Sequence, residues 1–161
     1  MKKKSNYIGI DHLALAVPNL GVAVKWMRDF LGFSVEETRE THGKNSGMKS
    51  AVLRLGPITI VVTEGIGENS QITQYLKKYG PGIQHVAFGV RNIKTAVEEA
   101  RLRGLEFSSD PIVSDGLSQI FSLRDQSTGM MIELIERRGF EGFRDENVQK
   151  LFDTLESKKI T

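Results

Sequence analysis

Three side chains in this sequence have the types and positions expected of metal ligands: His12, His85 and Glu133. The two histidines stand at equivalent places of an internal repeat, because residues 10–20 match residues 83–93 at five of eleven positions with an offset of 73. Residues that an internal pseudo-twofold axis relates face one shared cavity. A lone histidine in an apolar strand is more often a core residue, so the repetition is what favours a metal site here.

Glu133 lies within the apolar run from Met130 to Ile135, which is typical of a buried strand. Burying a carboxylate is costly unless it is paired or coordinates a metal, although the position could instead face solvent. The matching position of the first repeat is near Val61, which cannot coordinate a metal, so three protein ligands are expected. Two imidazoles and one carboxylate form the facial triad of non-haem Fe(II) oxygenases, but Co, Zn, Mn and Ni sites can use the same ligands.

The elements that must position these ligands follow the order βαβββ in each half of the chain. Asn19 and Asn92 are expected to cap the two helices, at Val22 to Leu31 and Lys94 to Arg103, because a side-chain oxygen there satisfies an unpaired N–H. Beyond the first strand of each half, the expected strands are Phe33 to Thr38, Lys49 to Leu55, Thr59 to Thr63, Glu106 to Ser108, Ser118 to Leu123 and Met130 to Ile135.

These patterns predict an α+β fold in which two βαβββ modules, at about 8–66 and 82–137, pair into one half-open β-barrel around the metal site. A single domain over residues 1–161 is the expected organisation. Two further helices are expected, from Gln71 to Tyr79 and over about 146–157. Polar loops are expected at Thr41 to Gly47, Glu64 to Asn69 and Asp110 to Gly116.

The composition narrows the class of protein. Cysteine is absent, which excludes disulfides, thiolate metal sites and a cysteine nucleophile. The net charge is only +2 and the basic residues are scattered, apart from Lys2 to Lys4 and Arg137–Arg138, so nucleic-acid binding is not expected. No apolar stretch reaches the length of a membrane span and no signal sequence is recognisable, so a cytoplasmic location is expected.

The residues resemble the vicinal-oxygen-chelate superfamily over nearly the whole chain. The most similar members are the catalytic C-terminal domain of 4-hydroxyphenylpyruvate dioxygenase and hydroxymandelate synthase, which use Fe(II), O2 and a 2-oxo acid substrate. The stretches that carry this resemblance are 46–53, 70–76, 79–85, Gln119-Ile-Phe121, 132–137 and Gly142-Phe143 followed by an Asn147-bearing helix.

The resemblance implies roles for individual residues. His12, His85 and Glu133 correspond to the iron ligands, while Phe121 and Phe143 correspond to residues that sandwich an aromatic ring, although they could simply be core or lid aromatics. Two glutamines that polarise or position substrate and a serine in the pocket complete the set, at Gln71, Gln119 and Ser50.

The chain also departs from these dioxygenases. Thr63-Glu64-Gly65 replaces an Asn-Glu-Pro turn, and only Ser108 to Leu117 stands where an insertion is usual. No counterpart of the non-catalytic N-terminal domain is expected. The short loop and Ser127-Thr128-Gly129 resemble methylmalonyl-CoA epimerase instead. That enzyme uses paired glutamates and a fourth metal ligand from the first half, which are not found here.

The leading hypothesis is therefore an Fe(II)-dependent dioxygenase that decarboxylates and hydroxylates an aromatic 2-oxo acid, with O2 and this small molecule as its partners. The alternative is a metal-dependent epimerase, isomerase or lyase, for which only His42 and Glu64 are loop candidates for a base. A third possibility is a drug-sequestering or metal-free protein, which would not need the buried triad. His42 is expected to be solvated, and the apolar face of the C-terminal helix could serve as a homodimer interface.

Overall fold

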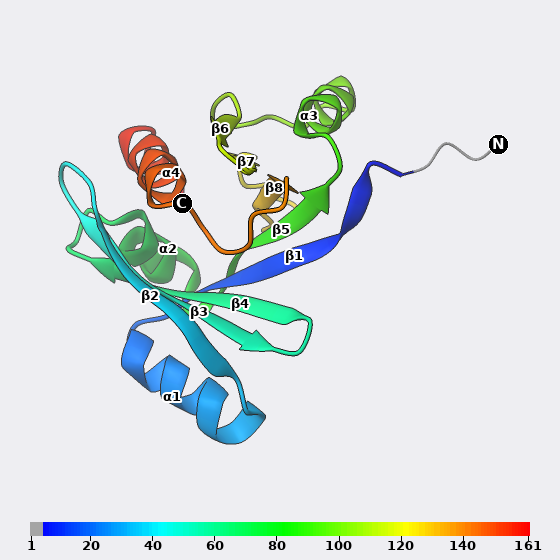
Figure 1. Cartoon of the computed structure of the whole chain (residues 1–161). Coiled ribbons are helices and arrows are strands. Elements are labelled where there is room, and N and C mark those ends of the chain that lie inside the picture. The colour runs from blue at the N-terminus through cyan, green and yellow to red at the C-terminus, as the bar shows by residue number, and fades with distance from the viewer. Residues whose placement is uncertain (1–4) are drawn as a thin grey trace.

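The computed structural model describes residues 5–161, so that Lys2 to Lys4 lie outside the described residues. Residues 5–161 form one curved sheet of eight strands with four helices around it (Figure 1). In chain order the elements are β1 (Tyr7–Ala16), α1 (Leu20–Leu31), β2 (Ser34–His42), β3 (Gly47–Leu55), β4 (Ile58–Ile66), α2 (Gln71–Tyr79), β5 (Gly82–Val90), α3 (Ile93–Leu102), β6 (Ile112–Ser114), β7 (Leu117–Phe121), β8 (Ile132–Arg137) and α4 (Asp145–Ser157).

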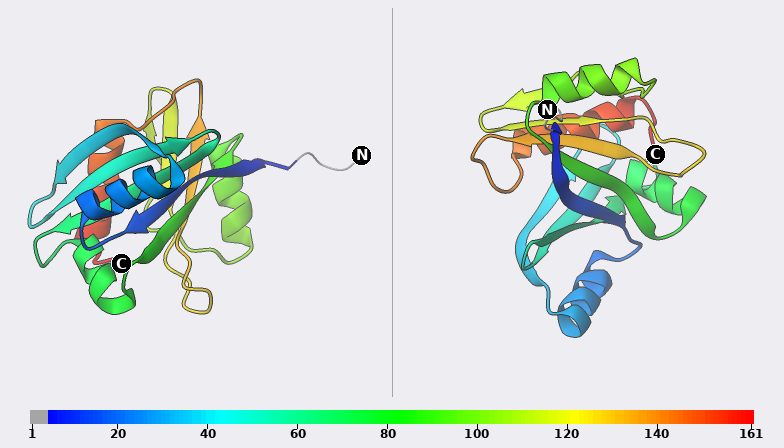
Figure 2. Two further views of the ribbon diagram at one scale, coloured as in Figure 1. Left: turned by 90° about the horizontal axis from the view of Figure 1, so that it is seen from below. Right: turned by 90° about the vertical axis from the view of Figure 1, so that its right-hand side faces the viewer.

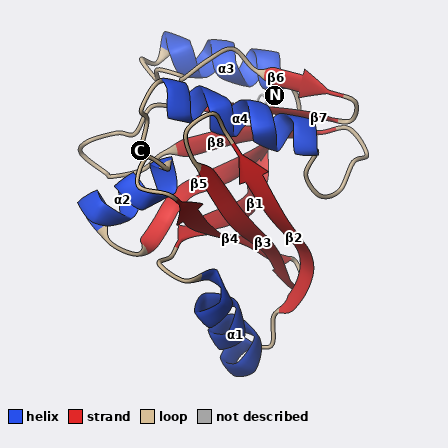
Figure 3. Ribbon diagram, turned by 90° about the vertical axis from the view of Figure 1, so that its left-hand side faces the viewer, coloured by secondary structure: helices blue, strands red, loops and turns tan. Residues whose placement is uncertain are grey.

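The strand order, β2-β3-β4-β1-β5-β8-β7-β6, reflects the sequence repeat. In each half the first strand pairs in parallel with the last, β1 with β4 and β5 with β8, and the remaining strands pair antiparallel. The two halves join where β1 pairs antiparallel with β5. The resulting sheet curls into a half-open barrel, which confirms the predicted fold of two βαβββ modules (Figure 3).

The prediction of a strand from Glu106 to Ser108 in the second half is wrong. Phe107 forms only an isolated bridge with Ser122, and the sixth strand is β6, within the segment predicted to be a loop. The reason is the tight turn at Gly116, whose φ of 76° lets the chain fold β6 back onto β7 as a hairpin. In the first half the predicted loop at 41–47 shrinks to 43–46, because β2 and β3 stay paired as far as His42 and Gly47.

The helix starts follow the predicted caps. Asn19 and Asn92 accept hydrogen bonds from the backbone N–H groups of Val22 and Thr95, both at 2.9 Å. A second pair of caps was not foreseen: the carboxylates of Glu64 and Glu136 accept from the N–H groups of Leu20 and Ile93, at 2.6 and 2.7 Å respectively. These matched contacts tie each module's last strand to the start of its helix.

Helices α1 and α3 pack on the two halves of the sheet, each over its own small core (Figure 2). Helix α4 instead covers the cavity inside the barrel, with Leu151, Phe152 and Leu155 buried. Its apolar face is therefore not free to form the dimer interface that the sequence suggested. Among the described residues, no helix has both the length and the apolar character needed to cross a membrane.

Candidate metal centre

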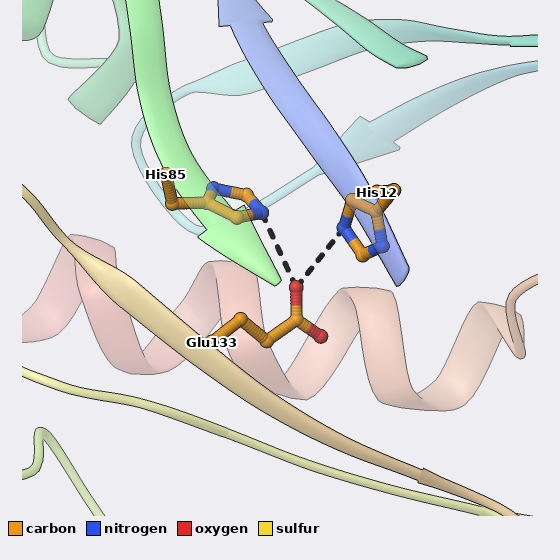
Figure 4. A group of neighbouring side chains, drawn as sticks. All are labelled: His12, His85 and Glu133. Carbon is orange, nitrogen blue, oxygen red and sulfur yellow. Dashed lines mark ion pairs between the residues drawn. The ribbon is translucent and has the colours of Figure 1, made fainter. Parts of the chain in front are cut away.

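The structure brings the three predicted metal ligands together from three adjacent strands: His12 on β1, His85 on β5 and Glu133 on β8 (Figure 4). One potential ligand atom from each lies within 4.8 Å of the others. Both histidine Nε2 atoms approach Glu133 Oε2, at 3.1 Å for His12 and 3.2 Å for His85. A break in the β1–β5 register between Ile10 and His12 helps to set which side chains face the interior.

The electrostatics of the three groups are strongly coupled. Burial alone would lower the pKa of His12, but the nearby carboxylates of Glu133 and Asp11 raise this pKa to about 9. Burial would raise the pKa of Glu133, yet the two imidazoles hold it well below its usual range. The pKa of His85 is lowered, chiefly by burial. Glu133 is thus held as a carboxylate, the form that binds a metal.

Each of the three side chains also makes a second hydrogen bond that fixes its orientation. Asp11 Oδ1 lies 2.8 Å from His12 Nδ1, and Gln84 Oε1 contacts His85 Nδ1. Gln119 Nε2 donates to Glu133 Oε1 at 2.7 Å, leaving Oε2 turned toward the imidazoles. Such partners fix the orientation of metal-ligating side chains. None of the sequence patterns singled out Asp11 and Gln84, although each directly precedes its histidine in the repeat.

The position equivalent to Glu133 in the first module carries an apolar side chain. In the second module Glu133 pairs with Ala87, and in the first Val61 pairs with Ala14, the residue equivalent to Ala87. Val61 lines the cavity, and its side chain has no atom that can bind a metal. Two nitrogens and one oxygen, all on the cavity side, suit a divalent ion that keeps positions free for exogenous ligands.

The cavity beside this centre is mainly apolar and contains all five of the predicted substrate residues: Ser50, Gln71, Gln119, Phe121 and Phe143. The two phenylalanine rings lie edge-on to the two imidazoles, at centroid distances of 5.0 Å for Phe143 with His12 and 4.7 Å for Phe121 with His85. Gln71 is buried, and its Oε1 has no hydrogen-bond partner within residues 5–161. This amide is therefore available to a ligand in the cavity.

Two contacts at or behind the cavity wall were not predicted from the sequence. Arg39 of β2 lines the cavity and binds the carbonyl of Phe143 at 3.0 Å and Asp145 at 2.7 Å, which ties the edge of the sheet to the start of α4. Asn147, fully buried on α4, donates to Gln119 Oε1 at 3.1 Å. A lone arginine in a polar strand gave no signal of its contacts, and the resemblance named the Asn147-bearing helix without indicating that Asn147 binds Gln119.

The two residues considered as loop bases lie elsewhere. His42 is solvent-exposed beside Glu40, which confirms the expectation that it is solvated. Glu64 caps helix α1 and is not among the residues that line the cavity. Within the described part of the chain, Glu133 is the only carboxylate that lines the cavity.

Comparison with known proteins agrees with this architecture. The model of the glyoxalase/bleomycin resistance protein/dioxygenase superfamily matches residues 11–122. The chain is 28% identical to 4-hydroxyphenylpyruvate dioxygenase of Pseudomonas aeruginosa over 75% of its own length and 43% of that protein.

Two solved structures are also similar. A mutant of 4-hydroxymandelate synthase from Streptomyces coelicolor superposes with a TM-score of 0.84 at 20% identity, over 99% of this chain and 56% of that one. Methylmalonyl-CoA epimerase from Mycobacterium tuberculosis gives 0.70 at 28% identity, over 85% and 93% respectively. The chain spans about half the length of the curated dioxygenase relatives that it matches. From the family match and the shared fold, the chain belongs to the glyoxalase/bleomycin resistance protein/dioxygenase superfamily.

Proposed function

We propose that this protein is a non-haem Fe(II) dioxygenase that acts on an aromatic 2-oxo acid, with decarboxylation and hydroxylation of the same molecule. The observation that carries the proposal is the combination of His12, His85 and Glu133 with Val61 at the equivalent fourth position. A three-ligand site leaves room for both a chelating substrate and O2. The iron, when bound, supplies the redox chemistry.

The residues of the chain have distinct roles in this proposal. His12, His85 and Glu133 hold the metal, and Gln119 keeps one Glu133 oxygen directed toward it. The cavity walls exclude water, and Phe121 and Phe143 offer apolar surface to an aromatic ring beside the two histidines. The unpartnered amide oxygen of Gln71 can accept a hydrogen bond from a donor group of the substrate, and the hydroxyl of Ser50 can donate or accept one.

Among the described residues, the cavity offers no general base for epimerisation other than the three proposed metal ligands. Moving a proton to and from carbon requires a general base within hydrogen-bonding reach of the substrate. Among the described residues that line the cavity, the histidines and the carboxylate are the three proposed ligands, and Arg39 is the only other charged side chain. Oxygen chemistry needs no such additional base, which is why it is preferred to an isomerase that uses the same metal ligands.

The test is anaerobic reconstitution with Fe(II), followed by phenylpyruvate-type 2-oxo acids while the visible charge-transfer band is recorded. We expect a band that decays on admission of O2, with one CO2 released for each O2 consumed. The control is Glu133→Ala, which removes one ligand and should abolish the band. His42→Ala, which alters an exposed histidine outside the cavity, should leave it unchanged.

Replacement of Fe(II) by Co(II), Zn(II), Mn(II) or Ni(II) separates metal binding from oxygen chemistry. If these ions bind to the same three residues but no 2-oxo acid gives a band with Fe(II), the oxygenase proposal is wrong. Epimerase and isomerase substrates would then be tested on the metal-loaded protein.

A further inference from the structure

Arg137, the last residue of β8, binds two different parts of the protein, Asp11 on β1 and the segment 138–144. Its Nε and Nη2 donate to the two carboxylate oxygens of Asp11, at 2.7 and 2.9 Å. Its Nη1 donates to the carbonyls of Gly142 at 2.6 Å and Phe140 at 3.3 Å. A planar guanidinium is suited to this two-pronged contact because its N–H groups match the spacing of a carboxylate.

The Asp11 carboxylate that Arg137 binds also contacts a proposed metal ligand, His12. Asp11 Oδ1, which accepts from Arg137, is also the atom that lies 2.8 Å from His12 Nδ1. Its hydrogen bond fixes the rotation of the imidazole and turns Nε2 toward Glu133. Without Arg137, the partly buried Asp11 carboxylate would lose the cation that holds it in place.

The second set of contacts holds the segment that packs against the same histidine. The segment 138–144, between β8 and α4, carries Phe143, whose ring lies 5.0 Å from the His12 ring. The guanidinium of Arg137 lies 5.3 Å from the Phe143 ring centroid and binds the carbonyl of Gly142 just before it. The contacts therefore form a closed circuit from Arg137 through Asp11 and His12 to Phe143 and back.

We propose that Arg137 is a positioning residue that couples the metal centre to the segment 138–144. By holding Asp11 it orients His12 as a ligand, and by holding the carbonyls of this segment it keeps Phe143 against that ligand. The inference rests on the metal site of the proposed function. It adds that metal occupancy and the order of segment 138–144 strengthen each other, because one side chain restrains both.

The histidine of the second module, His85, also has an arginine near it, but without this circuit. Arg124 donates to the backbone carbonyl of Gln84 at 2.7 Å and to that of Gly129 at 2.6 Å. His85 is oriented by the neutral Gln84 amide rather than by a carboxylate. Arg137 therefore acts on His12 through the Asp11 carboxylate, whereas next to His85 Arg124 binds only the backbone carbonyl of Gln84.

The test compares Arg137→Gln with Arg137→Lys and with a matched control, Arg138→Gln. Arg138 is the next residue and binds Ser118, Glu136 and the Ser114 carbonyl, but it has no contact with Asp11 or His12. The readouts are the Kd for Co(II), the visible spectrum of the Co(II)-loaded protein, and amide hydrogen exchange in segment 138–144 with and without the metal.

We expect Arg137→Gln to weaken Co(II) binding by about 10- to 100-fold, the usual effect of losing a residue that orients a ligand, and to alter the Co(II) spectrum. Metal-induced protection of segment 138–144 should also be lost. Arg137→Lys should recover part of the affinity, and Arg138→Gln should retain all of it. Asp11→Asn, which keeps an acceptor for His12 but removes the charge, tests the circuit if Arg137→Gln does not fold.

Unchanged Co(II) affinity and an unchanged spectrum in folded Arg137→Gln and Asp11→Asn would overturn the inference. So would an equal loss of affinity in Arg138→Gln, because the effect would then be general destabilisation. Wild-type protein that binds no divalent metal would instead refute the proposed function itself, so the two failures are distinguishable.

Discussion

Substitution of Gln119 by leucine is expected to destabilise the metal-free protein strongly. This residue is 2% exposed and makes two buried hydrogen bonds, to Glu133 Oε1 and from Asn147 Nδ2. A leucine has similar bulk but leaves both partners without a bond. A hydrogen bond to a charged group contributes about 1.5–3 kcal/mol and a neutral one about 0.5–1.5 kcal/mol, so we expect a loss of about 2–4 kcal/mol.

The measurement is urea unfolding of wild-type and Gln119→Leu proteins without metal, together with thermal unfolding. For a chain of this length each kcal/mol corresponds to about 2–4 °C, so the Tm should fall by about 4–16 °C. The matched control is Ser118→Ala, one residue earlier on β7, where a hydroxyl that accepts from the half-exposed Arg138 is removed. Its cost should be at most about 1 kcal/mol.

Asn147→Leu provides a second comparison within the same network. It removes the donor to Gln119, but it also removes a buried Oδ1 that has no hydrogen-bond partner among the described residues. Its cost should therefore be smaller than that of Gln119→Leu. A Gln119→Leu protein as stable as Ser118→Ala would refute the argument that Gln119 satisfies the buried Glu133 carboxylate.

Three further predictions concern the metal and the helix caps. Because the pKa of His12 is raised to about 9, its proton stabilises the metal-free fold below about pH 6.5, and this contribution is lost as the pH rises through 9. Zn(II) binding must displace that proton, so the affinity for Zn(II) should rise about tenfold per pH unit from 7 to 9. Calorimetric titrations in which the affinity does not depend on pH would contradict this. Val61→Glu should destabilise the metal-free protein and give a larger Zn(II)-induced rise in Tm than wild type, because the new carboxylate lies at the position equivalent to Glu133. An equal rise in Tm would argue against that equivalence. Glu136→Ala should lower the free energy of unfolding in urea by about 1–2 kcal/mol, and Glu136→Gln should lower it less, because the amide oxygen still accepts from the N–H of Ile93. Equal losses in the two variants would show that this hydrogen bond does not stabilise the helix.

The sequence was sufficient to predict the two modules and the three central residues. The repeat placed His12 and His85 at equivalent strand positions, and the apolar run around Glu133 favoured a buried carboxylate that pairs or coordinates a metal over one that faces solvent. The Asn19 and Asn92 caps were also predictable, because capping depends on residues only a few positions apart.

Other features depended on contacts between residues far apart in the chain. The hairpin of β6 and β7 replaced the expected strand at 106–108, and the apolar face of α4 turned inward over the cavity instead of outward to a partner. No local pattern reports which surface covers an amphipathic helix.

The partners of the metal centre were likewise decided only by the tertiary structure. Arg137 meets Asp11 across 126 positions of sequence, and Asn147 meets Gln119 across 28. Each of these polar residues has an ordinary solvent-exposed alternative, so its type and neighbours do not identify it. The sequence thus determined which residues could bind a metal, while the curvature of the sheet and the closure by α4 determined what holds them in place.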